Sequence, residues 1–356
     1  MISVGRARVA LTSTVAVALV AAGWYGWWLL AGNLVRHSIE GFSAAERARG
    51  GSVAIGAVEL GGFPFALRAE VRDLVVSRAD GSGWQAPGFT AEAPLWAVTT
   101  LAVRLTGAQQ ITLPAGFEAV AMTATGGEGH VSLGGASGFT AARLGLSHAT
   151  LQPIGTQIDK VELSAMVPAR QPANGGETGL TLLASADGVH FAAAEGQPLG
   201  PVIERLMVKA RLQGVPPRPS PPALTAWSRS GGSLLIDSAL IKWGPVTVES
   251  TGALELDRDL QPVGSIKAEV AGFGAAVDAL VAGGWVRAKD SHTLKAVLSG
   301  LAPHGGARPV VKLPISLHDH FLHVGPFRLA PVPTLVWLGD QRRPNQTTEA
   351  PPAIRQ

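Results

Sequence analysis

The chain has 356 residues, of which 46% are apolar, so it can bury a sizeable core and has the length of about two or three common domains. Only 15% of the residues are charged and the net charge is +3, which disfavours both a disordered chain and a nucleic-acid-binding protein. The absence of cysteine excludes disulfides, zinc–thiolate sites, iron–sulfur clusters and cysteine nucleophiles.

Residues 9–31 form an uncharged apolar segment that predicts a transmembrane helix. A helix of these 23 residues spans about 34 Å, enough for a hydrocarbon core of about 30 Å. Arg6 and Arg8 precede the segment, so the positive-inside rule predicts a cytoplasmic N-terminus and a periplasmic bulk. A membrane-interface belt is expected at the far end of the segment, formed by Trp24, Tyr25, Trp27 and Trp28. The alternative is a cleaved signal peptide, because small residues at 21–23 suit a cleavage site.

Residues 32–50 have the spacing of an amphipathic helix. Ile39 and Phe42 recur on one face, while Glu40 and Glu46 are expected to be solvated charges. The apolar face of this helix either packs on the protein's own sheet or contacts the membrane.

After residue 51 the period becomes that of β-strands. Two alternating runs flank a predicted hairpin turn, the motif Gly61, Gly62, Phe63, Pro64 and Phe65. The return strand carries a solvated face that either remains exposed or binds a lipid headgroup, formed by Arg68, Glu70 and Arg72. Similar short runs bounded by turn-forming residues follow, including 95–105, whereas 202–212 fits either a strand or a helix. The predicted fold class is mainly β: an N-terminal transmembrane helix, then a large, curved antiparallel β-sheet region with a few short helices.

A Pro-rich connector divides the predicted β region. Its five prolines exclude a regular helix or a central strand, and short helices are expected after it at 224–230, 275–282 and 291–302. The predicted organisation begins with a cytoplasmic tail at residues 1–8, a transmembrane anchor at 9–31 and an amphipathic helix at 32–50. A first β-rich region at 51–212, the connector at 213–223, a second β-rich region at 224–338 and a flexible tail at 339–356 follow.

These motifs carry a resemblance. The resemblance rests on four motifs: the Gly-Gly-Phe-Pro-Phe turn, Trp243-Gly244-Pro245, the run from Gly252 to Asp257, and Val324-Gly325-Pro326. The chain resembles the bacterial domain-of-unknown-function family 2125 over nearly its whole length, to about Leu338. A strand–Gly–strand–Asp unit is also similar to AsmA-like envelope proteins. Those proteins are anchored in the inner membrane and associated with lipid traffic, so that similarity implies lipid handling.

Signatures of catalysis are missing from the sequence. It contains no Gly-x-Ser-x-Gly, Ser-x-x-Lys, His-Glu-x-x-His or Walker loop, so no catalytic residue and no cofactor are predicted. The candidate metal ligands are His318 and His320, which would point the same way on a strand. The competing interpretation is a hairpin turn at Asp319 and His320. Core or sheet-edge packing is expected for most of Trp84, Trp96, Trp227, Trp243, Trp285 and Trp337.

The expected function is that of a non-enzymatic envelope protein, anchored in the bacterial inner membrane, which binds or passes lipid along an apolar β groove. The alternative is a structural or adaptor protein that recruits partners through its sheet edges. The expected partners are the membrane and lipid, with no nucleic acid, and the protein partners are open. Alternation alone fits a filled core as well as an open groove.

Overall fold

The computed structural model describes residues 40–335 apart from gaps at 42, 80, 113–120, 135–138, 193–196, 198, 218–219, 285, 302–308, 325–326 and 333. Within these residues, 16 strands form one continuous sheet whose neighbouring pairs are antiparallel. The predicted mainly β, antiparallel fold with a few short helices is therefore confirmed. The transmembrane helix predicted at 9–31 lies outside the described residues.

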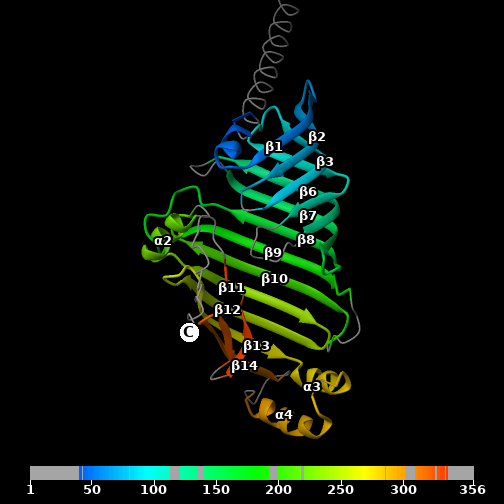
Figure 1. The fold of residues 1–356 in the computed structure, drawn as a ribbon, viewed down its shortest axis with the longest axis vertical. Coiled ribbons are helices and arrows are strands. Elements are labelled where there is room, and N and C mark those ends of the chain that lie inside the picture. The colour runs from blue at the N-terminus through cyan, green and yellow to red at the C-terminus, as the bar shows by residue number, and fades with distance from the viewer. Residues whose placement is uncertain are drawn as a thin grey trace, which may run out of the picture.

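The strands cross the sheet in chain order, except that the short β5 pairs with β3 and β6 beside β4. Figure 1 shows them stacked along the long axis of the molecule, from blue β1 to orange β14. Their bounds are β1 Ser52–Gly61, β2 Ala66–Ser77, β3 Gly83–Pro94, β4 Thr100–Thr106, β5 Gln109–Thr112, β6 Ala121–Leu133, β7 Phe139–Gln152, β8 Thr156–Met166, β9 Thr178–His190, β10 Val202–Gln213, β11 Leu234–Trp243, β12 Val246–Leu256, β13 Pro262–Ala271, β14 Val310–His318, β15 Phe321–Val324 and β16 Phe327–Pro331.

Backbone hydrogen bonds determine the secondary structure of two segments for which the sequence prediction was wrong or ambiguous. The run 95–105 was predicted to be one strand, but Ala97 N donates to Pro94 O and Thr100 N donates to Ala97 O. These bonds close a turn, so β4 begins only at Thr100. The ambiguous segment 202–212 is a strand, because it lies between β9 and β11 and bonds to both.

The Pro-rich connector contains the start of a helix. Helix α2, Pro221–Arg229, has proline in its first turn, so the prediction that 213–223 holds no helix was wrong for its last three residues. Proline is tolerated there because the first N–H groups of a helix have no intrahelical partner. Gln213 ends β10, and β10 pairs with β11. The β-rich regions on either side of the connector therefore belong to one sheet.

Helices α3, Phe273–Ala282, and α4, Ala288–Leu301, confirm the two helices expected in this part of the chain. They lie together at the far end of the sheet from β1 (Figure 1). Phe273 and Val311 are buried against each other, and Leu298 of α4 packs on them. The two helices therefore cover the sheet at β14.

The short helix at residues 40–48 packs on the opposite end of the sheet. The prediction that Glu46 is a solvated charge was wrong, because its residue is only 4% exposed. Glu46 accepts from Arg78 Nε at 3.0 Å and from Arg49 Nη1 at 3.3 Å. A buried carboxylate requires such partners, and Arg78 follows β2, so the pair ties the helix to the sheet.

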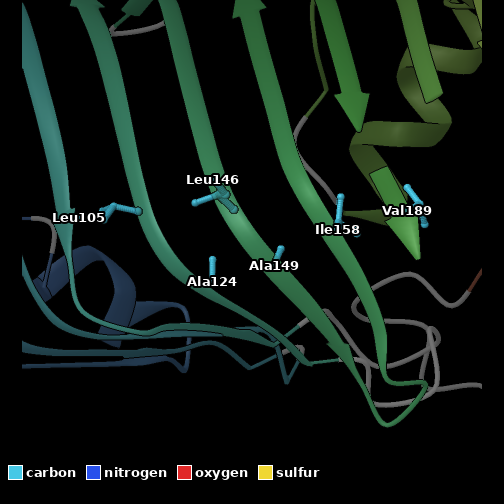
Figure 2. Close-up of a cluster of buried hydrophobic side chains, with 6 residues drawn as sticks. All are labelled: Leu105, Ala124, Leu146, Ala149, Ile158 and Val189. Carbon is cyan, nitrogen blue, oxygen red and sulfur yellow. The ribbon is translucent and has the colours of Figure 1, made fainter. Parts of the chain in front are cut away.

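The largest core cluster lies on one face of the central strands (Figure 2). Its members come from β4 to β9 and are Leu105, Ala124, Leu146, Ala149, Ile158 and Val189. Ala124, Ala149, Ile158 and Val189 lie directly opposite one another in successive strands. Gln109 is fully buried beside them, where its amide accepts from Trp84 Nε1 and donates to two backbone carbonyls. The buried amide of Gln109 therefore has hydrogen-bond partners for both its oxygen and its nitrogen.

Replacing Leu146, which is 1% exposed, with alanine is expected to reduce the free energy of unfolding by about 2–5 kcal/mol, because it leaves a cavity among packed side chains. Urea unfolding followed by tryptophan fluorescence measures the loss. Leu163→Ala is the control, since Leu163 is 43% exposed and its truncation is expected to cost about 0.5 kcal/mol or less. Equal losses for the two variants would contradict the assignment of Leu146 to the buried core and of Leu163 to an exposed part of the sheet.

Candidate apolar binding face

The register of the sheet places apolar side chains on one face across nearly all of its width. Because successive side chains alternate between faces and directly opposed residues share a face, the pairs define each face strand by strand. One such row runs from β8 to β11 through Leu163, Ala184, Val208 and Ala239. The neighbouring row runs through Val161, Ala186, Leu206 and Ile241. We call the face that contains these rows the apolar face.

Part of the apolar face is exposed. The exposed fractions are 43%, 36%, 41% and 40% for Leu163, Leu182, Val208 and Ile241, which we call the apolar stripe. These residues come from four neighbouring strands, β8 to β11. Alanines at 165, 184, 210 and 239 lie between them, so large and small side chains alternate from one strand to the next within these rows. The stripe therefore presents large aliphatic side chains with alanines between them.

The apolar face is covered on both sides of the stripe. Toward β4, the core cluster around Leu146 is at most 9% exposed. Toward β14, Val311 is covered by Phe273 of α3. The stripe thus lies between two packed parts of the same face, and contiguous exposed apolar surface of this kind marks sites of interaction.

The opposite face of the same strands is polar and hollowed. A hollow of about 880 Å³ is lined by side chains from β4 to β10, among them Arg104, Glu128, Arg143, Glu162 and Lys209. Lys160, also in its lining, lies 2.6 Å from Glu162, and this hydrogen bond raises the pKa of Lys160. Charged side chains therefore line much of the hollow. Leu163 also lines it, whereas the other three stripe residues, Leu182, Val208 and Ile241, do not.

The charged strand face predicted near β2 also lies on the polar side. Arg68 pairs with Glu92 at 2.9 Å, and Arg72 pairs with Glu70 at 3.1 Å and with Glu59 at 3.4 Å. All of these side chains are about half exposed. The prediction of an exposed strand face is therefore confirmed, and the carboxylates already occupy the two guanidinium groups.

An ion pair supports the stripe from the polar side where β10 and β11 are irregular. The register between β10 and β11 shifts between Lys209 and Ala210, and the register between β11 and β12 shifts between Ile236 and Ala239. Arg211 donates to both carboxylate oxygens of Asp237 across these shifts, the shortest bond being 2.6 Å. The hydrogen bonds from Arg211 lower the pKa of Asp237 from its usual value.

The two candidate metal ligands lie at a hairpin. Asp319 and His320 have φ values of 51° and 60°, the left-handed conformations of a two-residue turn between β14 and β15. His318 ends β14 instead of sharing a strand face with His320, and its ring stacks on that of His323 with centroids 3.9 Å apart. A hydrogen bond from His318 lowers the pKa of Asp319. Among the described residues, no group of three or more side chains is arranged to hold a metal ion.

The Gly-Gly-Phe-Pro-Phe motif forms the turn between β1 and β2, as predicted. Phe63 and Phe65 project outward from it, with exposed fractions of 47% and 68%. The interface belt of Trp24, Tyr25, Trp27 and Trp28 lies outside the described residues. In the part of the chain that the structure describes, no helix has the length and hydropathy to cross a membrane.

Sequence reasoning did not single out the residues of the stripe. Leu182 and Leu183 are adjacent and similar in type, and only the register assigns Leu182 to the apolar face and Leu183 to the hollow. The signal that could have indicated these residues is the recurrence of alanine between large aliphatic residues on successive strands. Trp96 also departs from the expected packing of the tryptophans, because it is 71% exposed.

The fold and this face define a mainly antiparallel β protein built on a single large sheet. The chain belongs to the family described as an uncharacterized protein conserved in bacteria (DUF2125), whose sequence model matches residues 28–333. The resemblance in the sequence motifs is thereby confirmed. No curated protein and no solved structure matches the chain, so the similarity to AsmA-like proteins stays a prediction.

The lowered pKa of Asp237 predicts an acid-dependent loss of stability. A folded-state pKa below the unfolded value of about 3.9 means that the pair's contribution is complete above that value and is lost as the pH falls through the folded pKa. Asp237→Asn is therefore expected to lower the stability at pH 7, and the difference from the unchanged chain should vanish at strongly acidic pH. Urea unfolding at several pH values measures the difference. Glu255→Gln, at an exposed carboxylate on β12, should leave the pH dependence nearly unchanged.

Proposed function

We propose that this chain is a non-enzymatic protein of the bacterial envelope that binds lipid on its apolar stripe. The observation that carries the proposal is the alignment of half-exposed aliphatic side chains across four neighbouring strands. An occupant of such a surface must offer apolar groups, because the stripe side chains present neither donors nor acceptors. An acyl chain meets this condition, and each methylene removed from water contributes about 0.8 kcal/mol.

The proposed binding mode is an acyl chain lying across the strands. Directly opposed residues of neighbouring strands are about 4.5–5.5 Å apart at Cβ, so an extended chain meets one side chain per strand. The alanines at 184 and 239 leave room for methylenes between the larger residues. The lipid headgroup then projects beyond the stripe toward solvent.

The proposed location follows from the N-terminal sequence. Residues 9–31 anchor the chain in the inner membrane with the N-terminus in the cytoplasm, and the sheet lies in the periplasm. The membrane that holds the anchor is the proposed source of the lipid. The sheet stays near this membrane because only a short amphipathic segment separates it from the anchor.

The second candidate function is recruitment of a protein partner by strand addition. Among the described strands, β1 bonds to β2 alone, so the other edge of this ten-residue strand offers backbone donors and acceptors. An adaptor of this type would bind through the edge and would not require the stripe.

Photo-crosslinking from two adjacent residues tests the lipid proposal. The full chain is expressed in bacterial cells with photoreactive benzoylphenylalanine in place of Leu182 or, as the matched control, Leu183. The two leucines are neighbours on β9 with exposed fractions of 36% and 39%, but they lie on opposite faces. Mass spectrometry of the irradiated protein is expected to detect phospholipid adducts several-fold more abundant from position 182.

Equal adduct yields from the two positions, or none from position 182 in a correctly folded chain, would contradict the lipid proposal. A protein adduct from position 182 would also count against it, because a protein would then cover the stripe. Benzoylphenylalanine at Ala54, on the free edge strand β1, tests the adaptor alternative, which predicts a protein adduct there.

A further inference from the structure

The most exposed aromatic side chains of the described residues belong to two turns at one end of the strands. Trp96 lies between β3 and β4 and is 71% exposed. Phe65 lies between β1 and β2 and is 68% exposed, and Phe63 of the same turn is 47% exposed. Aromatic side chains usually bury most of their surface, so their collection at one place requires an explanation.

The two turns are held against each other by backbone hydrogen bonds. Leu95 N donates to Phe65 O at 3.1 Å, which joins the turn after β3 to the turn before β2. Ala66 N donates to Gly62 O at 2.9 Å within the first turn. Leu95 itself is only 3% exposed and anchors its turn in the protein. Trp96 therefore projects outward from a fixed backbone. We call Phe63, Phe65 and Trp96 the aromatic tip.

A third turn extends this apolar surface. Leu133 N donates to Thr99 O at 2.7 Å, and the Leu133 side chain is 41% exposed. The sequence around all three turns lacks charge, since residues 60–67, 93–103 and 131–142 contain no Asp, Glu, Lys or Arg. The polar residues of these segments are only serine and threonine, so no ion would have to be dehydrated where they enter an apolar interface.

The tip lies at the end of the sheet where the described chain begins. Figure 1 shows the turn between β1 and β2 at the upper end of the molecule. The short helix at residues 40–48 precedes β1 and adjoins the other ends of these two strands, because Ser52 pairs with Ser77 and Glu46 pairs with Arg78. The uncharged segment 9–31 precedes that helix in the sequence by only a few residues. A membrane spanned by that segment would lie close to β1 along the chain, and the turn with Phe63 and Phe65 ends the same strand.

We propose that the aromatic tip inserts into the interfacial region of a lipid bilayer and forms a second contact between the sheet and the membrane. Tryptophan and phenylalanine partition into the boundary between headgroups and acyl chains, and the absence of charge around the turns removes the cost of dehydrating ions there. This contact fixes the orientation of the sheet above the membrane. It is independent of the apolar stripe, which lies on strands β8 to β11.

Single-cysteine labelling of the full chain tests the proposal. Because the natural sequence has no cysteine, Phe65→Cys, Trp96→Cys and Ile154→Cys each accept one environment-sensitive nitrobenzoxadiazole probe. Ile154 is the matched control, since it is 59% exposed and also lies in a turn, but at the opposite ends of the strands. The chains are reconstituted into vesicles of phosphatidylethanolamine and phosphatidylglycerol, with and without nitroxide-labelled lipid.

Probes at positions 65 and 96 are expected to emit at shorter wavelength in vesicles and to be quenched by the nitroxide lipid, whereas the probe at position 154 should show neither effect. A probe at Phe63→Cys should lose most of its quenching when Phe65→Asp and Trp96→Asp are added. Circular dichroism confirms that these variants retain the β-sheet.

Emission at positions 65 and 96 that matches position 154 would overturn the proposal. A wavelength shift that depends on the protein density in the vesicles and not on the nitroxide lipid would also overturn it, because a second copy of the chain would then cover the tip. Adducts at the stripe are measured separately, so lipid binding at the stripe can fail while the tip still contacts the bilayer.

Discussion

The structure depends on the register of one antiparallel sheet. Each strand presents alternate residues to opposite faces, so a slip of one residue in any pair would transfer the apolar residues of all later strands to the polar face. The rows through Leu163 and Val208 show that the register is kept from β8 to β11 even where β10 and β11 contain irregularities. The Arg211–Asp237 pair is important for this reason, because it bridges the strands at the shifts. Gly127 has a related role, since a Cβ there would lie 2.7 Å from Leu105 and 2.9 Å from Leu146, the two leucines that pack over it.

A single sheet buries its apolar face only where another element or its own curvature covers it. Helices α3 and α4 provide a cover at β14, and the short helix with Glu46 joins the sheet near the start of β1. The large side chains of the central cluster, such as Leu146, cover one another and the small residues between them. The four residues of the stripe remain, and their exposure follows from the width of the sheet relative to the few helices available to cover it.

The sequence predicted the parts of this fold that depend on local periodicity. Alternating runs identified the strands, and the Gly-Gly-Phe-Pro-Phe motif and the segment at Asp319 were identified as turns because their residues favour the required backbone conformations. The parts that depend on distant contacts were not predictable in this way. Glu46 is buried where Arg78, 32 residues later, returns beside it, and α2 is held to the end of β10 by a hydrogen bond from Trp227 Nε1 to Gln213 O. Only the pairing of β9 with its neighbours distinguishes Leu182 from Leu183, and only the bond between Leu95 and Phe65 brings Trp96 beside the first turn.

A lipid on the apolar stripe would take the place of the layer that the fold lacks. In a two-layered β protein a second sheet removes the apolar face of the first from water, whereas this sheet leaves that face partly open between its core cluster and α3. An acyl chain bound there loses contact with water together with Leu163, Leu182, Val208 and Ile241, so the same burial contributes to lipid affinity and to the stability of the folded state. A ligand that binds only the folded chain stabilises it by RT ln(1 + [L]/Kd), so the proposed binding would couple the stability of the central strands to the supply of lipid. The proposed membrane contact of the aromatic tip would add a geometric condition, because a sheet held at the bilayer by its turns would keep the stripe at a constant distance from the lipid.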